Sequence, residues 1–165
     1  MVIGNSLQTK NKENKFYVSS WEYSNSLLND NNVDIGYKYA VLLDGAGPKF
    51  NDDRNQTNEM RKVYPITSDE WYPSLTNFME KLEKIHNVRF VIAGHPKSNF
   101  NDDSKEFGGR SVYYGKAKEL VRNSELVITR GSLATVFCLI YNKPVFFIYN
   151  NQMLFASEQH IKKAT

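Results

Sequence analysis

The chain has 165 residues, of which 41% are hydrophobic, and this suits one globular domain or one half of a two-domain enzyme. Its formal net charge of +3 is small and its basic residues are scattered, which argues against binding to nucleic acid or to a charged membrane surface. A single cysteine excludes an internal disulfide, and no apolar run is as long as a membrane span or resembles a secretory signal. We therefore expect a soluble, cytoplasmic protein.

The N-terminal part of the chain has no clear hydrophobic period. We expect an irregular arm or linker over residues 1–37, followed by one domain over residues 38–165. The domain opens with Tyr39 to Leu43, an apolar run typical of a strand that is buried on both faces.

A glycine-rich turn, Asp44 to Pro48, follows this strand. Gly45 and Gly47 allow positive φ and the close approach of a ligand to the backbone. The spacing is not a dinucleotide-binding fingerprint, because no third glycine opens a helix directly afterwards. A glycine-rich loop at the carboxyl end of a first strand is nevertheless where ligands bind open α/β sheets.

A long amphipathic helix is predicted next. Thr67 to Glu70 has the pattern of a capping box, and apolar positions from Trp71 to Ile85 recur with the helical period. Pro73 is typical of a first helical turn, so we expect the helix to start a few residues after the capping box.

Residues Val88 to Ala93 form the next predicted strand, which delivers Gly94-His95-Pro96-Lys97 into a loop. His95 follows an apolar strand and precedes a proline that fixes the direction of the loop. Its ring would hydrogen-bond the phosphate, sugar or base of a nucleotide, with Lys97 neutralising a diphosphate. The alternative is a histidine that caps the local backbone.

The middle of the domain is less regular. We expect a polar loop over residues 99–109, a short strand over 110–114 and a short helix over 116–122. Gly115 and Lys116, between that strand and helix, are a second candidate contact for a ligand.

The last part of the chain is predicted to form a strand, a helix, a strand and a final helix. The strands cover residues 126–129 and 145–149, and the final helix covers 152–163. Short connections between parallel strands make the first three elements a βαβ unit. Cys138 lies on the first helix and is expected in the core, together with the apolar stripe of Leu133, Val136, Phe137 and Ile140.

Arg130, Gly131 and Ser132 form the turn that enters this helix. Backbone amides at a helix N-terminus are unpaired, and the helix dipole adds positive charge there. Gly131 lets a ligand approach, Ser132 and Thr135 supply hydroxyls and Arg130 supplies a cation, which together suit a phosphate or diphosphate. The alternative is an ordinary N-cap beside a surface arginine.

Five short strands that alternate with helices predict an α/β fold with an open, mainly parallel, Rossmann-like sheet and helices on both faces. The Asp44 loop, His95 and the Arg130 turn all follow carboxyl ends of strands, which lie at one edge of such a sheet. We therefore expect these three loops to meet in one site. Adjacent carboxylates in two loops are expected to be solvated rather than to bind a metal: Asp52, Asp53, Asp102 and Asp103.

Several stretches resemble the C-terminal, nucleotide-binding half of GT-B-type glycosyltransferases. They are VIAGHPKS at 91–98, FGGR at 107–110, the stretch from Tyr114 to Tyr149, and KYAVLLDGAGPKFNDD at 38–53, which resembles the opening strand and loop. The resemblance covers about Tyr39 to Tyr149 and is closest to bacterial capsular or surface polysaccharide biosynthesis proteins and to sialyl- and polysialyltransferases. In the latter, a His-Pro motif and a hydroxyl-rich motif hold the CMP part of the donor.

The resemblance implies a metal-independent glycosyltransferase without a cofactor, acting in bacterial surface or capsular polysaccharide biosynthesis, at most peripheral to the inner face of the membrane. Its substrates would be a nucleotide sugar, CMP-linked in preference to UDP- or GDP-linked, and a glycan acceptor. It places His95 on the nucleotide or its phosphate, and Ser132 and Thr135 on phosphate. Arg130-Gly131 departs from the family, which usually has a small or hydroxyl residue there. Residues 1–37 are too few for the acceptor domain of such enzymes, so we expect a missing N-terminal domain or a partner chain.

The candidate site residues follow from both lines of reasoning. The catalytic candidates are His95 and Asp44, whose carboxylate would be a general base or a structural acceptor. Two other functions stay open: a non-catalytic nucleotide-binding, sugar-binding or scaffolding domain, and a nucleotide-sugar epimerase. The epimerase has less support, because no acidic pair lies near the Gly131 turn. Nucleotide or phosphate binding is predicted for Gly45, Gly47, His95, Pro96, Lys97, Gly115, Lys116, Arg130, Gly131, Ser132 and Thr135.

Overall fold

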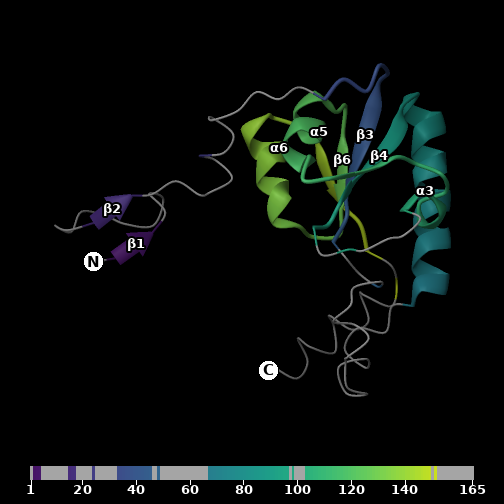
Figure 1. The fold of residues 1–165 in the computed structure, drawn as a ribbon, viewed down its shortest axis with the longest axis horizontal. Helices are drawn as coiled ribbons and strands as arrows, with labels where there is room; N and C mark the ends of the chain where they lie inside the picture. The colour runs from purple at the N-terminus through teal and green to yellow at the C-terminus, as the bar shows by residue number, and fades with distance from the viewer. Residues whose placement is uncertain are drawn as a thin grey trace.

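A computed structural model describes residues 2–4, 15–17, 24, 33–45, 48, 67–96, 98, 103–149 and 151 of the chain (Figure 1). Its centre is a sheet of five strands, all parallel, in the order β5-β4-β3-β6-β7. This confirms the predicted open, parallel α/β fold. The strands are β3 (Tyr39–Leu43), β4 (Arg89–Gly94), β5 (Val112–Tyr114), β6 (Val127–Thr129) and β7 (Val145–Phe147).

The first strand of the sheet in sequence, β3, lies in its middle. From β3 the chain moves outward to β4 and β5, then returns to the other side of β3 to form β6 and β7. Leu43, the last residue of β3, is level with Ala93 of β4 on one side and Thr129 of β6 on the other. The strand order therefore reverses between β3 and β6, and the loops that leave these strands emerge side by side.

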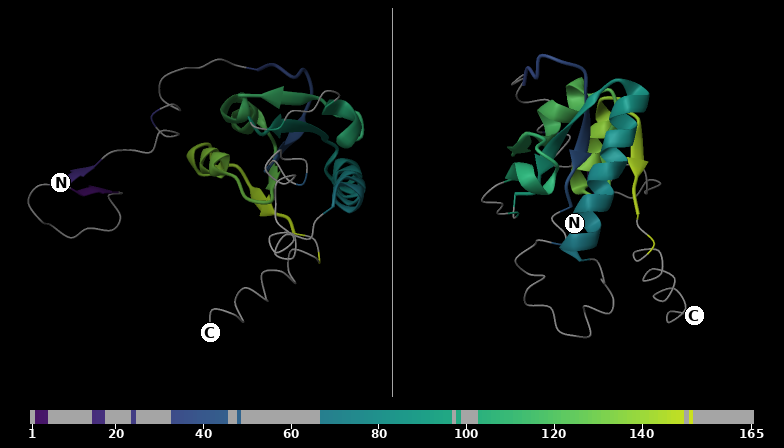
Figure 2. Two further views of the ribbon diagram at one scale, coloured as in Figure 1. Left: turned by 60° about the horizontal axis from the view of Figure 1, so that its bottom comes forward. Right: turned by 90° about the vertical axis from the view of Figure 1, so that its right-hand side faces the viewer.

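Helices cover both faces of the sheet, as predicted (Figures 1 and 2). Helix α3 (Ser68–His86) packs on one face, where Leu75 and Met79 join the core side chains of Ala40 and Leu42. Helices α5 (Ala117–Asn123) and α6 (Val136–Ile140) belong to the other face, whose core includes the opposite side chains of β3. Alternate residues of β3 thus enter two separate cores, which explains why the whole strand is apolar.

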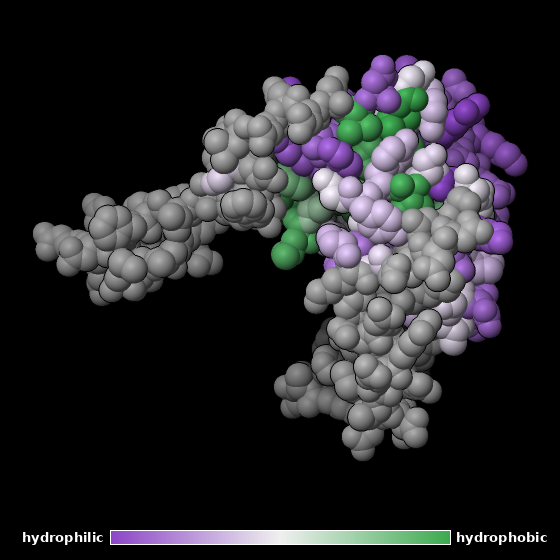
Figure 3. Space-filling model, in the orientation of Figure 1, coloured by the Kyte–Doolittle hydropathy of each residue, from purple (hydrophilic) through white to green (hydrophobic). Residues whose placement is uncertain are grey.

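Helix α3 has the amphipathic character that its sequence predicts. Its buried residues face the sheet, while its outer side is hydrophilic, seen as the purple atoms at the right of Figure 3. The expected late start is wrong, because the helix begins at Ser68 and contains Pro73. The amide of Trp71 donates to the carbonyl of Thr67 at 3.0 Å, which is the hydrogen bond of the first helical turn. Pro73 comes two residues after Trp71 and is exposed to solvent. Its missing N–H removes only one backbone hydrogen bond of the helix.

The region expected as a polar loop, residues 99–109, contains a short helix, α4 (Asp103–Glu106). It also contains Phe107, which is fully buried and packs edge-to-face on Tyr72 with ring centroids 5.5 Å apart. Isolated aromatic residues in a polar stretch carry no periodic signal, so the burial of Phe107 could not be predicted from the sequence pattern.

The segment after β6 also differs from its prediction. Residues Leu133–Thr135 form a 3-10 turn, η3, before α6 begins. The expected apolar stripe is therefore wrong at Leu133, which is 86% exposed, because a 3-10 turn places its side chains at a different angle from an α-helix. Phe137 is buried as predicted, and Val136 and Ile140 pack against the same core.

The predicted N-terminal arm contains two short strands, β1 (Val2–Gly4) and β2 (Lys15–Tyr17), which pair in parallel. The predicted final helix over residues 152–163 lies outside the described residues. Among the helices described, none is both long enough and apolar enough to cross a bilayer.

Candidate functional site

The carboxyl ends of the central strands bring three predicted loops to one edge of the sheet. Asp44 follows β3, His95 follows β4 and Arg130 follows β6. Because β4 and β6 flank β3, the backbones at His95 and Arg130 are two strand spacings apart, or about 10 Å. The imidazole-bearing loop and the Ser132 turn therefore lie on the same edge, within the span of one small ligand.

The β3 and β6 loops touch each other through Arg130. Its guanidinium Nη2 donates to the carbonyl oxygen of Gly45 at 3.4 Å, and its guanidinium carbon lies 5.6 Å from the ring centroid of Trp71. Arg130 thus reaches from β6 to the β3 loop and to the first turns of α3. It is partly buried and is not a simple surface arginine.

Gly45 lies beside the Arg130 turn at this contact. A Cβ at position 45 would lie 3.4 Å from the carbonyl oxygen of Gly131 and 3.6 Å from Nε of Arg130. Its φ is not positive, so the expected need for positive φ does not apply to Gly45. Both distances are ordinary van der Waals contacts, so the Cβ of an alanine would fit between the two loops.

Thr129, the last residue of β6, fixes the turn that follows. Its fully buried hydroxyl donates to the carbonyl of Leu43 at 3.3 Å and accepts from the amide of Gly131 at 3.1 Å. Gly131 adopts a φ of 142°, which favours glycine. One side chain therefore ties β3, β6 and the Gly131 turn together. A threonine at a strand end is the only sequence feature that relates to this role.

Ser132 caps η3 as predicted. Its Oγ accepts from the amide of Ala134 at 3.3 Å, and its carbonyl accepts from the amide of Thr135 at 3.0 Å. Within the described residues, the amides of Ser132 and Leu133 have no acceptor. The Oγ1 atom of Thr135 is buried and has no hydrogen-bond partner there either, so this predicted phosphate contact points away from solvent.

On the other side of β3, Asp44 and the His95 loop are joined by Ser98. The Ser98 hydroxyl contacts Oδ2 of Asp44 at 3.4 Å, and its amide donates to the carbonyl of His95 at 2.9 Å. Asp44 and Ser98 are each only 7% exposed, and the amide of Asp44 bonds the carbonyl of Ala93 at 3.1 Å. Ser98 closes a turn around His95, a role that the sequence analysis missed although a serine three residues after a histidine-proline turn is compatible with it.

The remaining predicted residues lie further along the edge or outside the described residues. Gly115, with φ 65°, and Lys116 follow β5, next to the His95 loop, and Lys116 Nζ lies 3.6 Å from Glu119. Pro96 is exposed beside His95. Gly47, Lys97, Asp52, Asp53 and Asp102 are outside the described residues, as is the side chain of Asp103.

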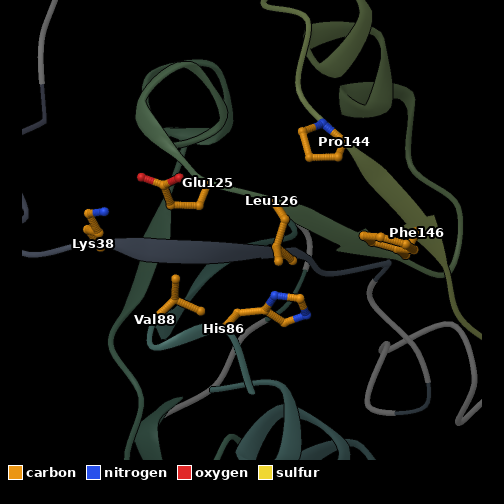
Figure 4. A pocket seen from close by; sticks show the side chains of 7 residues that line it. All are labelled: Lys38, His86, Val88, Glu125, Leu126, Pro144 and Phe146. Carbon is orange, nitrogen blue, oxygen red and sulfur yellow. The ribbon is translucent and has the colours of Figure 1, made fainter. Parts of the chain in front are cut away.

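A cavity of about 290 Å³ lies at the opposite, amino-terminal edge of the sheet (Figure 4). It contains His86, which is exposed, together with Lys38 and Glu125. Its other lining residues are apolar: Val88, Leu126, Pro144 and Phe146. Because ligands of open α/β sheets bind at the carboxyl ends of strands, we place the candidate site at the Asp44, His95 and Arg130 loops and not in this cavity.

Cys138 is a core residue, as predicted, and is 1% exposed. Burial raises the pKa of its thiol to about 11. Within the described residues no three His, Cys, Asp or Glu side chains cluster in a way that could hold a metal. No protein-family model matches the chain, and no curated protein matches its sequence significantly.

Proposed function

We propose that this domain binds a nucleotide sugar at the carboxyl edge of its sheet, as the donor-binding half of a metal-independent glycosyltransferase of bacterial surface or capsular polysaccharide biosynthesis. The observation that carries the proposal is the junction of the β3 and β6 loops, where Arg130 contacts Gly45 at 3.4 Å. This junction lies where the strand order reverses, the position at which open α/β sheets bind ligands.

The chemistry of the junction suits an anion. A guanidinium has five N–H donors in a planar fork, and the contact with Gly45 uses only one side of it. The amides of Ser132 and Leu133 add donors at the adjacent turn. Ser132 already accepts from Ala134 through Oγ, so its own O–H proton remains to donate to a phosphate oxygen.

In the proposed reaction the bond between the anomeric carbon of the donor sugar and a phosphate oxygen breaks, and the acceptor hydroxyl attacks that carbon and gives its proton to a general base supplied with the acceptor domain. The nucleotide then departs as an anion. Arg130, His95 and the turn amides would stabilise the developing charge, and one such preorganised donor is worth about 3 kcal/mol in a transition state. The resemblance of the His95-Pro96 motif favours a CMP-linked donor.

The experiment is a binding titration of the purified chain by calorimetry with CMP, CDP, UDP, GDP and pyrophosphate. Arg130→Met is expected to weaken binding of all phosphate-bearing ligands at least tenfold, since it removes a charged donor. Arg122→Met is the matched control, because Arg122 also lies over an aromatic ring, Tyr141 at 5.9 Å, but on α5. It should leave binding unchanged.

His95 is tested in the same way against His86, which lies at the opposite edge of the sheet. His95→Ala should weaken CMP binding and His86→Ala should not. If wild-type protein binds none of these ligands at millimolar concentration, or if the His86 variant alone loses binding, the proposed site is wrong. Binding without any sugar transfer once an acceptor domain is supplied would favour the scaffolding alternative, and interconversion of a free nucleotide sugar would favour the epimerase.

A further inference from the structure

The two faces of the sheet are covered unequally at β7. On one face, Val145 of β7 belongs to the core that Val136 and Ile140 of α6 also join. Phe146 points to the opposite face, because side chains alternate along a strand and Phe146 is level with Ile128 in the core under α3. Ile128 is fully buried, whereas Phe146 is 55% exposed. Among the described residues, the β7 end of the α3 face is therefore open.

Helix α3 turns an apolar side towards this open end. Trp71, Phe78 and Ile85 follow one another at intervals of seven residues, or about two helical turns, and so lie along one side of α3. Trp71 lies under Arg130, which follows β6, so this side faces β6 and β7. Glu83, which bonds the segment that leads into β5, lies on the other side of the helix. Phe78 is nevertheless exposed and Ile85 is 72% exposed, so this apolar side is only partly covered.

The cavity at the amino-terminal edge of the sheet lies between the same two elements (Figure 4). His86 at the end of α3 and Phe146 of β7 both line it, and Leu126, which precedes β6, lines it as well. We call the surface between Phe78 and Ile85 of α3 and Phe146 of β7 the α3–β7 groove. The cavity is the amino-terminal end of this groove.

The width of the sheet indicates what fills the groove. Neighbouring strands are about 4.8 Å apart and a helix is about 10 Å wide, so a face of five strands accommodates two helices. The opposite face has two, α5 and α6. On the α3 face the described residues form α3 and the short helix α4, which precedes β5. The place beside α3 over β6 and β7 is therefore the size of one further helix.

Residues 152–163, for which the sequence predicts a helix, can reach this place. They follow β7 after a short connection, in which Ile148 packs on the core of the α3 face and Asn151 is already helical. A helix over these residues would be about 18 Å long, close to the roughly 20 Å that the six residues of β4 span. A helix that starts at the carboxyl edge can thus run back along β7 to the cavity.

The same residues have a matching apolar side. In a helix, Leu154 and Ile161 lie on one side with the small Ser157 between them, and Met153 lies next to this stripe. Gln159 lies on the opposite side. One side of the helix therefore suits an apolar groove and the other suits water.

We propose that residues 152–163 form a helix that packs in the α3–β7 groove, antiparallel to β7, with Leu154 and Ile161 turned towards the sheet. This direction brings Lys163 to the cavity, whose rim carries the exposed carboxylate of Glu125. The inference concerns an interaction surface and does not depend on nucleotide binding. It explains why a cavity lies at the edge of the sheet that does not bind ligands.

The test is thiol labelling of the full chain with DTNB. Ile85→Cys and Phe146→Cys each place one cysteine in the groove, from opposite sides, and Leu139→Cys is the control, because Leu139 is exposed on α6. The native Cys138 is buried, and wild type supplies the background. Both groove cysteines should react roughly tenfold more slowly than Leu139→Cys, because labelling requires the C-terminal helix to leave the groove.

Substitutions in residues 152–163 should remove this protection. With Leu154→Asp and Ile161→Asp added, Phe146→Cys should react as fast as Leu139→Cys, because two charges cannot enter an apolar groove without a large cost. Gln159→Asp should keep the protection. Circular dichroism checks that each variant is folded, and if the double aspartate variant is not, Ile161→Asp alone takes its place.

Groove cysteines that react as fast as Leu139→Cys, with residues 152–163 unaltered, would overturn the inference whether or not the aspartate variants fold. Protection that appears only at concentrations where sedimentation detects a dimer would overturn it too, since a second copy would then cover the groove. Protection that survives the aspartates in a folded monomer would show that another segment covers it. Protection of a monomer that the aspartates abolish and Gln159→Asp keeps supports the inference, whatever the nucleotide titrations give.

Discussion

The guanidinium of Arg110 donates two hydrogen bonds to the carboxylate of Glu83, of 2.6 and 2.9 Å. The same carboxylate accepts from the amide of Phe90 at 2.8 Å. Helix α3, strand β4 and the segment that leads into β5 are thus joined by one acidic side chain. His95 directly follows β4. This ion pair therefore helps to hold in place the strand that positions one loop of the candidate site.

The first prediction concerns the pH dependence of stability. Burial alone would raise the pKa of Glu83, but the hydrogen bonds from Arg110 and Phe90 and the charges of Arg110 and Arg89 together lower it. A lowered folded-state pKa gives stability that is present above the pKa of the unfolded chain and is lost as pH falls through the folded value. Glu83→Gln should therefore lower the free energy of unfolding by roughly 2 kcal/mol at pH 7 and by much less near pH 3.

Chemical denaturation at several pH values measures this difference. Glu80→Gln is the control, because Glu80 is exposed on the same helix. An equal deficit for Glu83→Gln at pH 7 and pH 3 would mean that packing, and not the charge, accounts for the contribution of Glu83.

The second prediction concerns Cys138, the chain's single cysteine. Its thiol is buried and its pKa is raised to about 11, so at pH 8 only roughly one molecule in a thousand would carry the reactive thiolate. A thiol reagent such as DTNB should leave the native protein unlabelled and label one equivalent after denaturation. Rapid labelling of native protein would contradict the placement of α6 against the sheet.

Much of this architecture follows from local sequence, and the exceptions have a common cause. Strand β3 has the predicted bounds, Tyr39–Leu43, because a strand buried on both faces is apolar throughout. Ser98 and Phe107 were missed because their roles depend on partners that are far away in sequence: Asp44 for the serine and Tyr72 for the phenylalanine. Periodicity reports which face of an element is buried and does not report such single contacts.

The candidate site also has one feature that the sequence predicts and one that it does not. The convergence of the β3, β4 and β6 loops could be predicted, since parallel strands place their carboxyl ends at one edge. The helical period predicts Trp71 on the apolar face of α3, and it is buried, but it also lies under the guanidinium of Arg130. Nothing in the sequence around Trp71 distinguishes a ring that only packs from one that also holds a cation.

The third prediction tests the packing at the end of β4. A Cβ on Gly94 would lie 2.6 Å from Cε1 of Tyr114 and 2.9 Å from Cγ1 of Val112, so a larger residue must displace these two side chains of the edge strand β5. Gly94→Ala should destabilise the protein by about 1–3 kcal/mol in denaturant titrations. Tyr114→Ala removes the closest obstacle, so the double variant should be more stable than the sum of the two single losses predicts. Strict additivity would show that Gly94 and Tyr114 do not meet.

The last prediction separates backbone strain at the candidate site from general loss of stability. Gly131 and Gly109 both have positive φ, of 142° and 80°, and at both positions a Cβ would meet nothing within 4 Å. Alanine at either position therefore acts only through the backbone, and each substitution should cost about 1–3 kcal/mol of unfolding free energy. Gly131, however, donates its amide to Thr129 at 3.1 Å and precedes the cap Ser132, whereas Gly109 lies before β5.

Gly131→Ala should therefore also weaken pyrophosphate binding severalfold, because a shifted turn misplaces the amides of Ser132 and Leu133. Gly109→Ala should lose similar stability and keep wild-type affinity when both are measured by calorimetry at a temperature where each variant is folded. Equal losses of affinity in the two variants would mean that the turn does not contact the anion. Retained affinity in Gly131→Ala would leave Arg130 as the only group of the β6 loop that can account for anion binding, because the amides of Ser132 and Leu133 would then have moved without effect.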